Sequence, residues 1–547
     1  MIKADSVVCG RVSQQARKRP DRAHFHIRCI FDCKNHMIVP GRECPLRCFL
    51  KVRPRRIPFR WKTVVVEIPR TSSFQRKANM RRNAVSSLLK DSIIVIGFLS
   101  LLSCTAHYAV NPKLDFKVRE SPFRDKLESP TKSDELFLIL AFSGGGTRAA
   151  SLSYGVLEAL DRIEIPPRGE DRSPHEAPAR HTLLDEVDLI TGVSGGSFTA
   201  AYFGLHARNA FRDFRETVLL QNLQSGLIGG LVNPVNWVRL WSPHFGRSDM
   251  AQEYYDRKIF HGATLGDLAS GKGPAVIILA TDAVDGIVFP FIPSQFALIC
   301  SDFEKFPLAR AVAASAAFPG PLTPIVLKNY AGQCPSRVPA WVTNALAKPD
   351  PASRTYQKAV MTKTYLERDT KPYIHLIDGG VSDNLGIRGI IETIAAQGGI
   401  RDVIKDERLA RTRRVVFIIV DAQAQDKPRW RLLDEIPGLA AVLGASSTIM
   451  VNKYNYETMD LLRRYAQDWA HKDAASDDKP IEIYITHVTF ASLSDKVQRE
   501  YFQGIPTALA LPEDQVDKLR EVAGKLLYSE ESFNRLVTDL GGKMPGS

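Results

Sequence analysis

The chain has 547 residues, 44% of them hydrophobic and 24% charged, which excludes a disordered or fibrous protein and allows a large buried core. Eight cysteines in this length exclude a disulfide-dense scaffold. The formal charge of +13 would favour a nucleic-acid partner, but residues 104–547 hold 51 Lys and Arg against 54 Asp and Glu, so we expect no nucleic-acid binding by the main part of the chain.

Residues 1–79 are rich in arginine and proline and carry 19 Lys and Arg against 5 Asp and Glu. They show no helical or alternating apolar period, and our hypothesis is a disordered basic segment or an upstream extension, with Met80 as the true start. The segment also holds two cysteine pairs of metal-ligand spacing with a histidine between them, namely Cys29 and Cys33, Cys44 and Cys48, and His36. A zinc site is therefore an alternative here.

Residues 80–103 have the pattern of a secretory signal peptide, with a basic start and an apolar run over Ile93–Leu102. The run is too short to span a bilayer, which takes about 20 apolar residues. The sequence Leu-Leu-Ser-Cys that ends at Cys104 resembles a bacterial lipobox. This resemblance implies cleavage before Cys104, a lipid anchor on its thiol and, since Thr105 follows, an outer-membrane lipoprotein of the bacterial envelope. A signal peptide cut elsewhere, or a short buried helix, is the alternative.

Residues 104–134 are polar and are predicted to form a tether. Beyond them, continuous apolar runs, typical of strands buried on both faces, alternate with helical patterns such as Thr147–Ile163. The predicted strands are Glu135–Phe142, Val187–Thr191, Ala275–Thr281, Ile374–Ile377 and Val415–Asp421, with Ile481–Phe490 as an edge strand. This order predicts an α/β fold, a three-layer α/β/α sandwich with a mostly parallel central sheet, over residues 135–425. Two loops, Pro166–Arg180 and roughly Ala331–Lys371, are predicted to be insertions in this fold. Residues 426–547 are predicted to be a mostly helical extension that packs on this core.

Two glycine-rich loops follow predicted strands. Gly144, Gly145 and Gly146 stand between the first strand and a helix, where backbone N–H groups and the helix N-terminus favour an anion. A dinucleotide phosphate would need an acidic residue about 20 positions further on, at the end of a second strand, and that region is a proline-containing charged loop. The other candidate anion is the oxyanion of an acyl-transfer reaction.

The second loop, Gly192-Val193-Ser194-Gly195-Gly196, has the G-x-S-x-G pattern of a nucleophile elbow between a strand and a helix. No histidine after Ser194 lies in a glycine-rich loop at a strand end, and His375 is expected to be a packed core side chain. Asp378, which ends a strand before two glycines, can act as the base directly. The alternatives are that Ser194 is a helix cap and that Asp378 is a turn former.

Together these motifs resemble the patatin-like phospholipase family. The matching stretches are GGGTR at 144–148, GVSGG at 192–196, DGG at 378–380 and, with Phe318 shifting its spacing, AASAAFP at 313–319. The resemblance implies a patatin-like fold and a lipolytic acyl hydrolase acting on membrane lipids. It implies Ser194 as nucleophile, Asp378 as base, and an oxyanion hole at the glycine loop, with Arg148 holding the loop or an anionic head group.

No cofactor and no metal is expected, and Asp282 and Asp285 are interpreted as turn residues at a strand end. A non-catalytic lipid-binding protein, a thioesterase or a general esterase are the alternatives in function. The segment Gly226–Phe245 combines Trp237 and Trp241 with few charges, which suggests membrane contact. A buried helix and loop is the favoured interpretation, since aromatic stripes usually pack into cores.

Overall fold

The structure is a computed structural model of the whole chain. It describes residues 25–30, 47–52, 63–64, 111–115, 123, 126, 132–166, 180–335, 338–403, 410–425, 429–432, 434, 436–474 and 480–545. The predicted signal segment 80–103, the lipidation candidate Cys104 and most of the inserted loop Pro166–Arg180 lie outside these ranges. The chain divides into two units, residues 1–98 and 99–547.

The first unit contains three short strands, β1 (Phe25–Ile30), β2 (Arg47–Val52) and β3 (Thr63–Val64), although its sequence shows no strand period. They pair antiparallel in the order β1-β2-β3. The register sets Cys29 opposite Cys48, while Cys33 and Cys44 lie outside the described residues.

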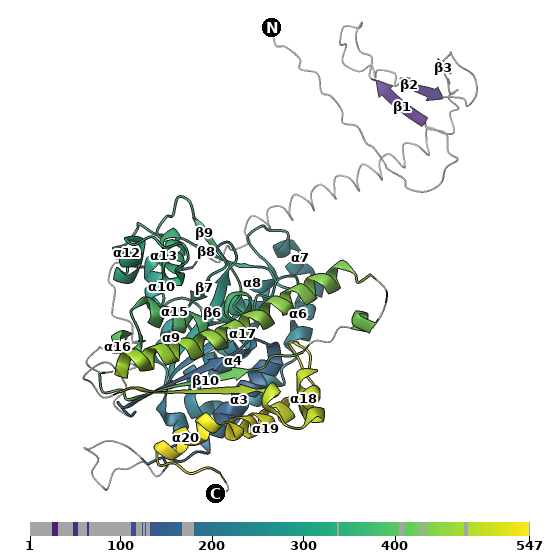
Figure 1. Cartoon of the computed structure of the whole chain (residues 1–547). Helices are drawn as coiled ribbons and strands as arrows, with labels where there is room; N and C mark the ends of the chain where they lie inside the picture. The colour runs from purple at the N-terminus through teal and green to yellow at the C-terminus, as the bar shows by residue number, and fades with distance from the viewer. Residues whose placement is uncertain are drawn as a thin grey trace. The chain divides into compact units, whose positions relative to one another are not determined.

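The second unit is built on an eight-stranded sheet of order β11-β10-β4-β5-β6-β9-β8, with β7 paired to β6 (Figure 1). Its strands are β4 (Leu136–Phe142), β5 (Val187–Val193), β6 (Ala275–Asp282), β7 (Val288–Pro290), β8 (Ile325–Lys328), β9 (Tyr373–Asp378), β10 (Arg414–Asp421) and β11 (Glu482–Thr489). The five strands from β11 to β6 are parallel, and β7, β8 and β9 add antiparallel pairs.

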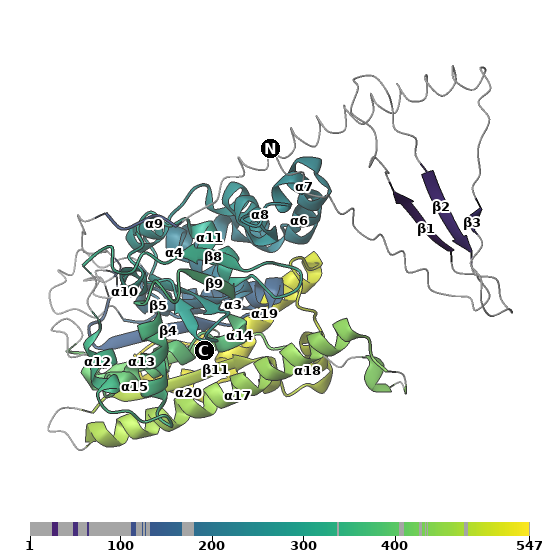
Figure 2. The same ribbon diagram turned by 90° about the horizontal axis from the view of Figure 1, so that it is seen from above.

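Helices cover both faces of this sheet because its central strands are apolar on both sides. In β4, Leu138, Leu140 and Phe142 face a core shared with α3 (Gly146–Asp161), α4 (Gly195–His206) and α19 (Glu513–Ser529). Ile139 and Ala141 face the other core, which α15 (Arg388–Ala396) and α17 (Leu439–Ala474) complete (Figure 2). The predicted three-layer α/β/α sandwich with a mostly parallel sheet is confirmed.

The polypeptide after residue 425 is joined closely to this sandwich. The edge strand β11 pairs in parallel with β10. Helix α19 packs along α3, where a side chain on Gly155 would meet the backbone of Arg520. The remaining helices of this part are α18 (Lys496–Gln503) and α20 (Glu531–Asp539). Part of the predicted tether also lies on the domain, since Asn111 bonds to Ser301 and Lys328.

Three local expectations are wrong. The segment 331–371 is not simply a loop, because it contains α12 (Ala340–Leu346) and α13 (Arg354–Thr364). His375 is exposed and not packed in the core, because β9 buries one face only, through Ile374 and Leu376, and His375 lies on the other face. The segment Gly226–Phe245 forms α6 (Leu223–Val232) and α7 (Pro234–Leu240), whose apolar side chains are largely exposed.

Among the residues that the structure describes, no helix is both long enough and apolar enough to cross a membrane.

Candidate active site

Ser194 stands on a sharp turn between β5 and α4. Its φ of 48° and ψ of −118° are unusual for a residue with a side chain, and such backbone strain costs about 1–3 kcal/mol. Helix α4 begins at the next residue, so the serine lies at the positive end of its dipole. The side chain is half-buried while both neighbours are buried. The turn therefore presents one hydroxyl at the carboxyl edge of the sheet.

The glycines around Ser194 are required by close packing. A Cβ on Gly195 would lie 2.0 Å from the carbonyl oxygen of Gly146 in the other glycine loop. A Cβ on Gly196 would lie 2.6 Å from the carbonyl oxygens of Phe142 and Ser143. The G-x-S-x-G pattern thus allows the elbow and the glycine loop to touch backbone to backbone.

Asp378 reaches the same edge on an antiparallel strand. In the register, Val193 of β5 pairs with Leu279 of β6, and the next residue of β6, Ala280, pairs with Asp378 of β9. Ser194 and Asp378 therefore flank β6 at one level. Thr281 fixes the strand end by donating its hydroxyl to the carbonyl oxygen of Asp378 at 2.8 Å.

Asp378 is buried, with 5% of the residue exposed. Burial raises its pKa to about 6, and hydrogen bonds from the N–H of Gly380 and from the Ser194 side chain oppose that rise. The Gly380 N–H donates to Oδ1 at 2.8 Å. A carboxylate with this pKa is mostly ionised at pH 7 and is a stronger base than an exposed aspartate.

The glycine loop offers fewer free donors than the sequence suggests. The N–H of Gly144 donates to the carbonyl oxygen of Asn384 at 3.0 Å, and that of Thr147 donates to Ala508 at 2.8 Å. Within the described part of the chain, the N–H groups of Gly145 and Gly146 have no such partner. Both residues have positive φ, 141° and 62°, which favours glycine. Gly145 and Gly146 are the candidate oxyanion donors, and Gly144 fixes the loop to the turn after Asp378.

Arg148 does not point to the reaction site, which corrects its place among the oxyanion-hole residues. It is 2% exposed, and its guanidinium donates to the carbonyl oxygens of Ala422 (2.7 Å) and Ile505 (2.5 Å) and to the hydroxyl of Thr507 (3.0 Å). Burial lowers its pKa to about 10. Of the two predicted roles, the structure supports holding the loop, because these donors are engaged with β10's end and the segment 505–508.

Ser315 was not singled out by the sequence as a site residue. It ends α11 (Leu308–Ser315), inside the AASAAFP stretch. Its hydroxyl accepts from the N–H of Ser194 at 2.9 Å and donates to the carbonyl oxygen of Leu279 at 2.6 Å. Its own carbonyl oxygen accepts from the N–H of Gly379, next to Asp378, at 3.1 Å. One buried residue thus joins the nucleophile turn to the base turn, and only its motif could have pointed to it.

Asp282 and Asp285 lie in a charge-compensated cluster at the end of β6. Both form ion pairs with Lys371, and Asp282 also accepts from the Tyr365 hydroxyl at 3.0 Å. Their charges therefore serve the fold at this turn. No group of three or more metal-ligating side chains is found in the described ranges.

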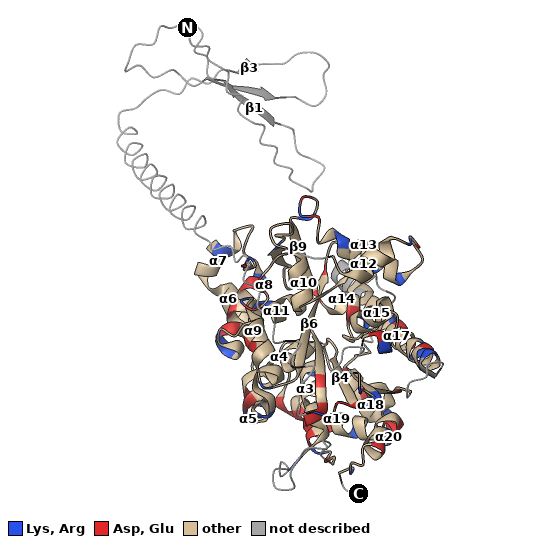
Figure 3. Ribbon diagram, turned by 90° about the vertical axis from the view of Figure 1, so that its left-hand side faces the viewer, with Lys and Arg blue, Asp and Glu red and all other residues tan. Residues whose placement is uncertain are grey.

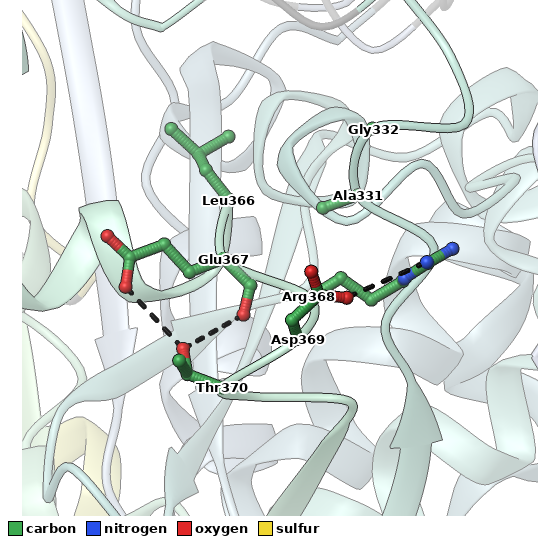
Figure 4. Close-up of a pocket in the computed structure, with 7 residues that line it drawn as sticks. All are labelled: Ala331, Gly332, Leu366, Glu367, Arg368, Asp369 and Thr370. Atoms are coloured by element: carbon green, nitrogen blue, oxygen red, sulfur yellow. Dashed lines mark hydrogen bonds and ion pairs between the residues drawn. The ribbon is translucent and has the colours of Figure 1, made fainter.

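A pocket in the inserted segment lies apart from the predicted site residues. Figure 4 shows its lining, which comes from Ala331 and Gly332 and from the turn after α13. Thr370 donates to the carbonyl oxygen of Glu367, and Arg368 pairs with Asp369, so these polar groups satisfy one another. Cys300 and Cys334 form a disulfide beside this segment, across 34 residues, which their wide spacing in the sequence did not predict.

One family model matches the part of the chain that contains the candidate site. Residues 140–391, less than half of the chain, match the family described as patatin-like phospholipase. This range contains Ser194, Asp378 and the glycine loop. No curated protein matches the chain.

Solved structures of a human enzyme are also similar. Human GIVD cytosolic phospholipase A2 is 12% identical, covers 77% of this chain and 64% of its own, and gives a TM-score of 0.34. The same protein in complex with methyl gamma-linolenyl fluorophosphonate is 13% identical, with coverages of 77% and 61% and a TM-score of 0.36. The chain therefore spans less than two thirds of the length of these structures.

Proposed function

We propose that the chain is a serine acyl hydrolase that cleaves fatty acyl esters of membrane phospholipids through a Ser194–Asp378 dyad. The observation that carries the proposal is that Ser194 and the buried carboxylate of Asp378 lie at one level on either side of β6, where the Ser194 side chain interacts with that carboxylate. The match of residues 140–391 to the patatin-like phospholipases supports lipids as the substrate class. A catalytic pair of this kind has no purpose in a lipid-binding protein.

In the first half of the reaction, Asp378 takes the proton of the Ser194 hydroxyl as Oγ attacks the ester carbonyl carbon. The carbonyl oxygen becomes an oxyanion, which the N–H groups of Gly145 and Gly146 stabilise. The bond to the leaving alcohol then breaks, and Asp378 returns the proton to that alcohol. The fatty acyl group is left as an ester on Ser194.

In the second half, water replaces the alcohol. Asp378 takes a proton from the water as its oxygen attacks the acyl carbon, and the same two N–H groups stabilise the second oxyanion. Collapse breaks the bond to Ser194 Oγ, which recovers the proton from Asp378. The products are a free fatty acid and the original enzyme.

The proposal is tested by release of fatty acid from radiolabelled phosphatidylcholine vesicles. We expect the protein to release fatty acid and the Ser194→Ala variant to release none above the uncatalysed rate. Hydrolysis of p-nitrophenyl butyrate or an acyl thioester with no release from the lipid would instead identify a general esterase or a thioesterase. No hydrolysis of any of them by folded protein would favour the lipid-binding alternative.

We also propose that the chain is a lipoprotein of the bacterial envelope, anchored at Cys104. The lipobox-like sequence that ends at Cys104 supports this location, and so does the disulfide between Cys300 and Cys334, since disulfides persist in oxidising compartments. Metabolic labelling with radioactive palmitate should mark the protein and be lost in Cys104→Ser. A labelled Cys104→Ser variant, or a native peptide mapping before Met80, would contradict this account of the N-terminus.

A further inference from the structure

The helical hairpin formed by α6 and α7 exposes an uncharged apolar surface. We call this surface the hairpin face; its side chains are Ile228, Leu231, Val232, Val235, Trp237 and Trp241. Trp241 is 78% exposed and Val235 is 67% exposed. Isolated apolar residues are common on protein surfaces, but a contiguous group of this size marks an interaction site.

Charge is almost absent from the hairpin. Helix α6 has no charged residue, and Figure 3 draws both helices almost wholly in tan. Arg239, the one charged residue of α7, is paired with Glu253 and lies 3.9 Å over the ring of Phe245. The hairpin face therefore presents no free charge to a partner.

The hairpin is linked to the nucleophile by a short series of contacts. Met250 of α8 (Arg247–Tyr255) packs against Gly230 of α6. Asp249 of α8 pairs with the buried Arg310 of α11 at 2.8 Å. Helix α11 ends at Ser315, which bonds Ser194. A surface that binds through α6 and α7 is thus held at a fixed distance from the reacting hydroxyl.

Further exposed apolar residues lie at the same end of the molecule. Figures 1 and 2 both place α6, α7, α18 and the first part of α17 on one side. Residues 439–452 of α17 contain no charged residue, and Ile449 and Met450 are exposed. Val497 of α18 is exposed as well. These helices add exposed apolar side chains to this end of the domain, apart from the hairpin face itself.

The start of the described domain is joined to α8, which supports the hairpin, through the short strand β8. Asn111 bonds the backbone of Lys328 at one end of β8, and Thr323, just before β8, accepts from the N–H of Ser248 in α8. The seven residues from Cys104 to Asn111 reach at most roughly 24 Å. An anchor on Cys104 would therefore keep this side of the domain near the bilayer.

We propose that the hairpin face docks on the surface of a phospholipid bilayer, with Trp237 and Trp241 at the boundary between head groups and acyl chains. Trp favours this boundary because its ring is apolar and its N–H is polar. The absence of free charge fits the lipid boundary better than a protein partner selected by charge. The inference rests on the proposed function, because it supplies the surface from which a lipid substrate enters the site.

The test uses the full chain carrying Cys104→Ser, so that no anchor masks the hairpin, and vesicles of pure phosphatidylcholine, which carry no net charge for the basic segment to bind. A Val235→Ser, Trp241→Ser variant is compared with a Val338→Ser, Val360→Ser control, whose residues are also exposed but belong to the region of α12 and α13, which Figure 1 shows apart from α6 and α7. We expect the vesicle partition coefficient to fall about tenfold or more in the hairpin variant and to stay unchanged in the control. Equal partitioning of the two variants would overturn the proposal.

Two further measurements separate a failure of membrane docking from a failure of the proposed function. Hydrolysis of soluble p-nitrophenyl butyrate should be unchanged in the hairpin variant, and its absence in every protein would contradict the proposed function without affecting the docking result. Brominated phosphatidylcholine should quench part of the Trp fluorescence, and a Trp237→Phe, Trp241→Phe variant should remove that part. No quenching, or a dimer in lipid-free solution that Trp241→Ser dissolves, would overturn the proposal, the latter in favour of a second copy of the chain.

Discussion

At the scale of single residues, the site combines two groups that are costly to the fold. Ser194 holds a strained backbone, and Asp378 is buried with few partners for its charge. Backbone strain and a buried charge persist only where surrounding contacts hold the residue in place, and both are typical of functional sites. Here the hydrogen bonds of Ser315 to Ser194 and of Thr281 to Asp378 hold the two residues in place.

Ser315→Ala should slow the chemical step more than it weakens binding. The substitution leaves the N–H of Ser194 and the carbonyl oxygen of Leu279 without the hydroxyl that joins them. We expect kcat to fall about tenfold or more with KM nearly unchanged, because the strained turn can then shift away from Asp378. Ser153→Ala is the matched control, since that buried hydroxyl has no hydrogen-bond partner among the residues that the structure describes. A Ser315→Ala enzyme with the kcat of the control would contradict this role.

As the pH rises and Asp378 ionises, the activity should increase while the stability contributed by this residue decreases. Its pKa is raised to about 6, so kcat/KM should fall below pH 6 as the base is protonated. Because the pKa is higher in the folded protein than in the unfolded chain, the ionised carboxylate destabilises the fold. This destabilisation is absent below about pH 4, where the group is protonated in both states, and is complete above about pH 6. Asp378→Asn should therefore abolish activity and stabilise the fold at pH 8 by on the order of 2–3 kcal/mol.

Urea unfolding at pH 4 and pH 8, with a pH–rate profile of the wild type, checks both effects. The gain in stability should be absent at pH 4. A variant that is less stable than the wild type at pH 8, or an activity without an acid limb near pH 6, would show that burial does not govern this carboxyl group.

At the scale of elements, helix α3 carries the glycine loop and is fixed by the C-terminal part of the chain. Arg148 reaches from its first turn to Ala422 and to the segment 505–508, and Ala508 accepts from Thr147. The glycine loop, the proposed oxyanion hole, therefore depends on residues that follow the matched family range.

Arg148→Met should destabilise the protein by about 2–4 kcal/mol, because it leaves buried carbonyl oxygens without donors. Activity should fall with it, and Arg148→Lys should not restore either, since lysine lacks the planar fork of donors. Arg411→Met is the matched control: Arg411 is 78% exposed in a surface pair with Asp134 and should change stability by less than about 0.5 kcal/mol. Chemical denaturation of the three variants measures these differences. An Arg148→Met protein as stable as the control would refute the claim that Arg148 fixes the glycine loop.

The strands that could be predicted are those whose own residues carry the signal. Runs such as ELFLILAF and VVFIIVD are apolar on both faces, which indicates central parallel strands whatever the partners are. The short strands β7 and β8 carry three and four residues and give no such signal. Strand β9 pairs antiparallel with β6, and no local sequence pattern encodes that direction.

At the scale of the whole molecule, the unpredicted features all join distant parts of the chain. The disulfide links residues 34 positions apart, Ser315 bonds a residue 121 positions away, and Arg148 bonds one 357 positions away. The exposure of the hairpin face also depends on the whole fold, because its composition alone fits a buried helix equally well. The motifs predict Ser194 and Asp378 as the reacting residues, and the tertiary contacts determine what holds these two residues in place.

The measurement that tests the account most directly is labelling of the full chain, carrying Cys104→Ser, with a fluorophosphonate, followed by peptide mass spectrometry. The account predicts one adduct on Ser194, absent in Ser194→Ala and formed much more slowly in Asp378→Asn. An adduct on another serine, or none in protein shown to be folded, would contradict the claim that Ser194 is a nucleophile activated by Asp378.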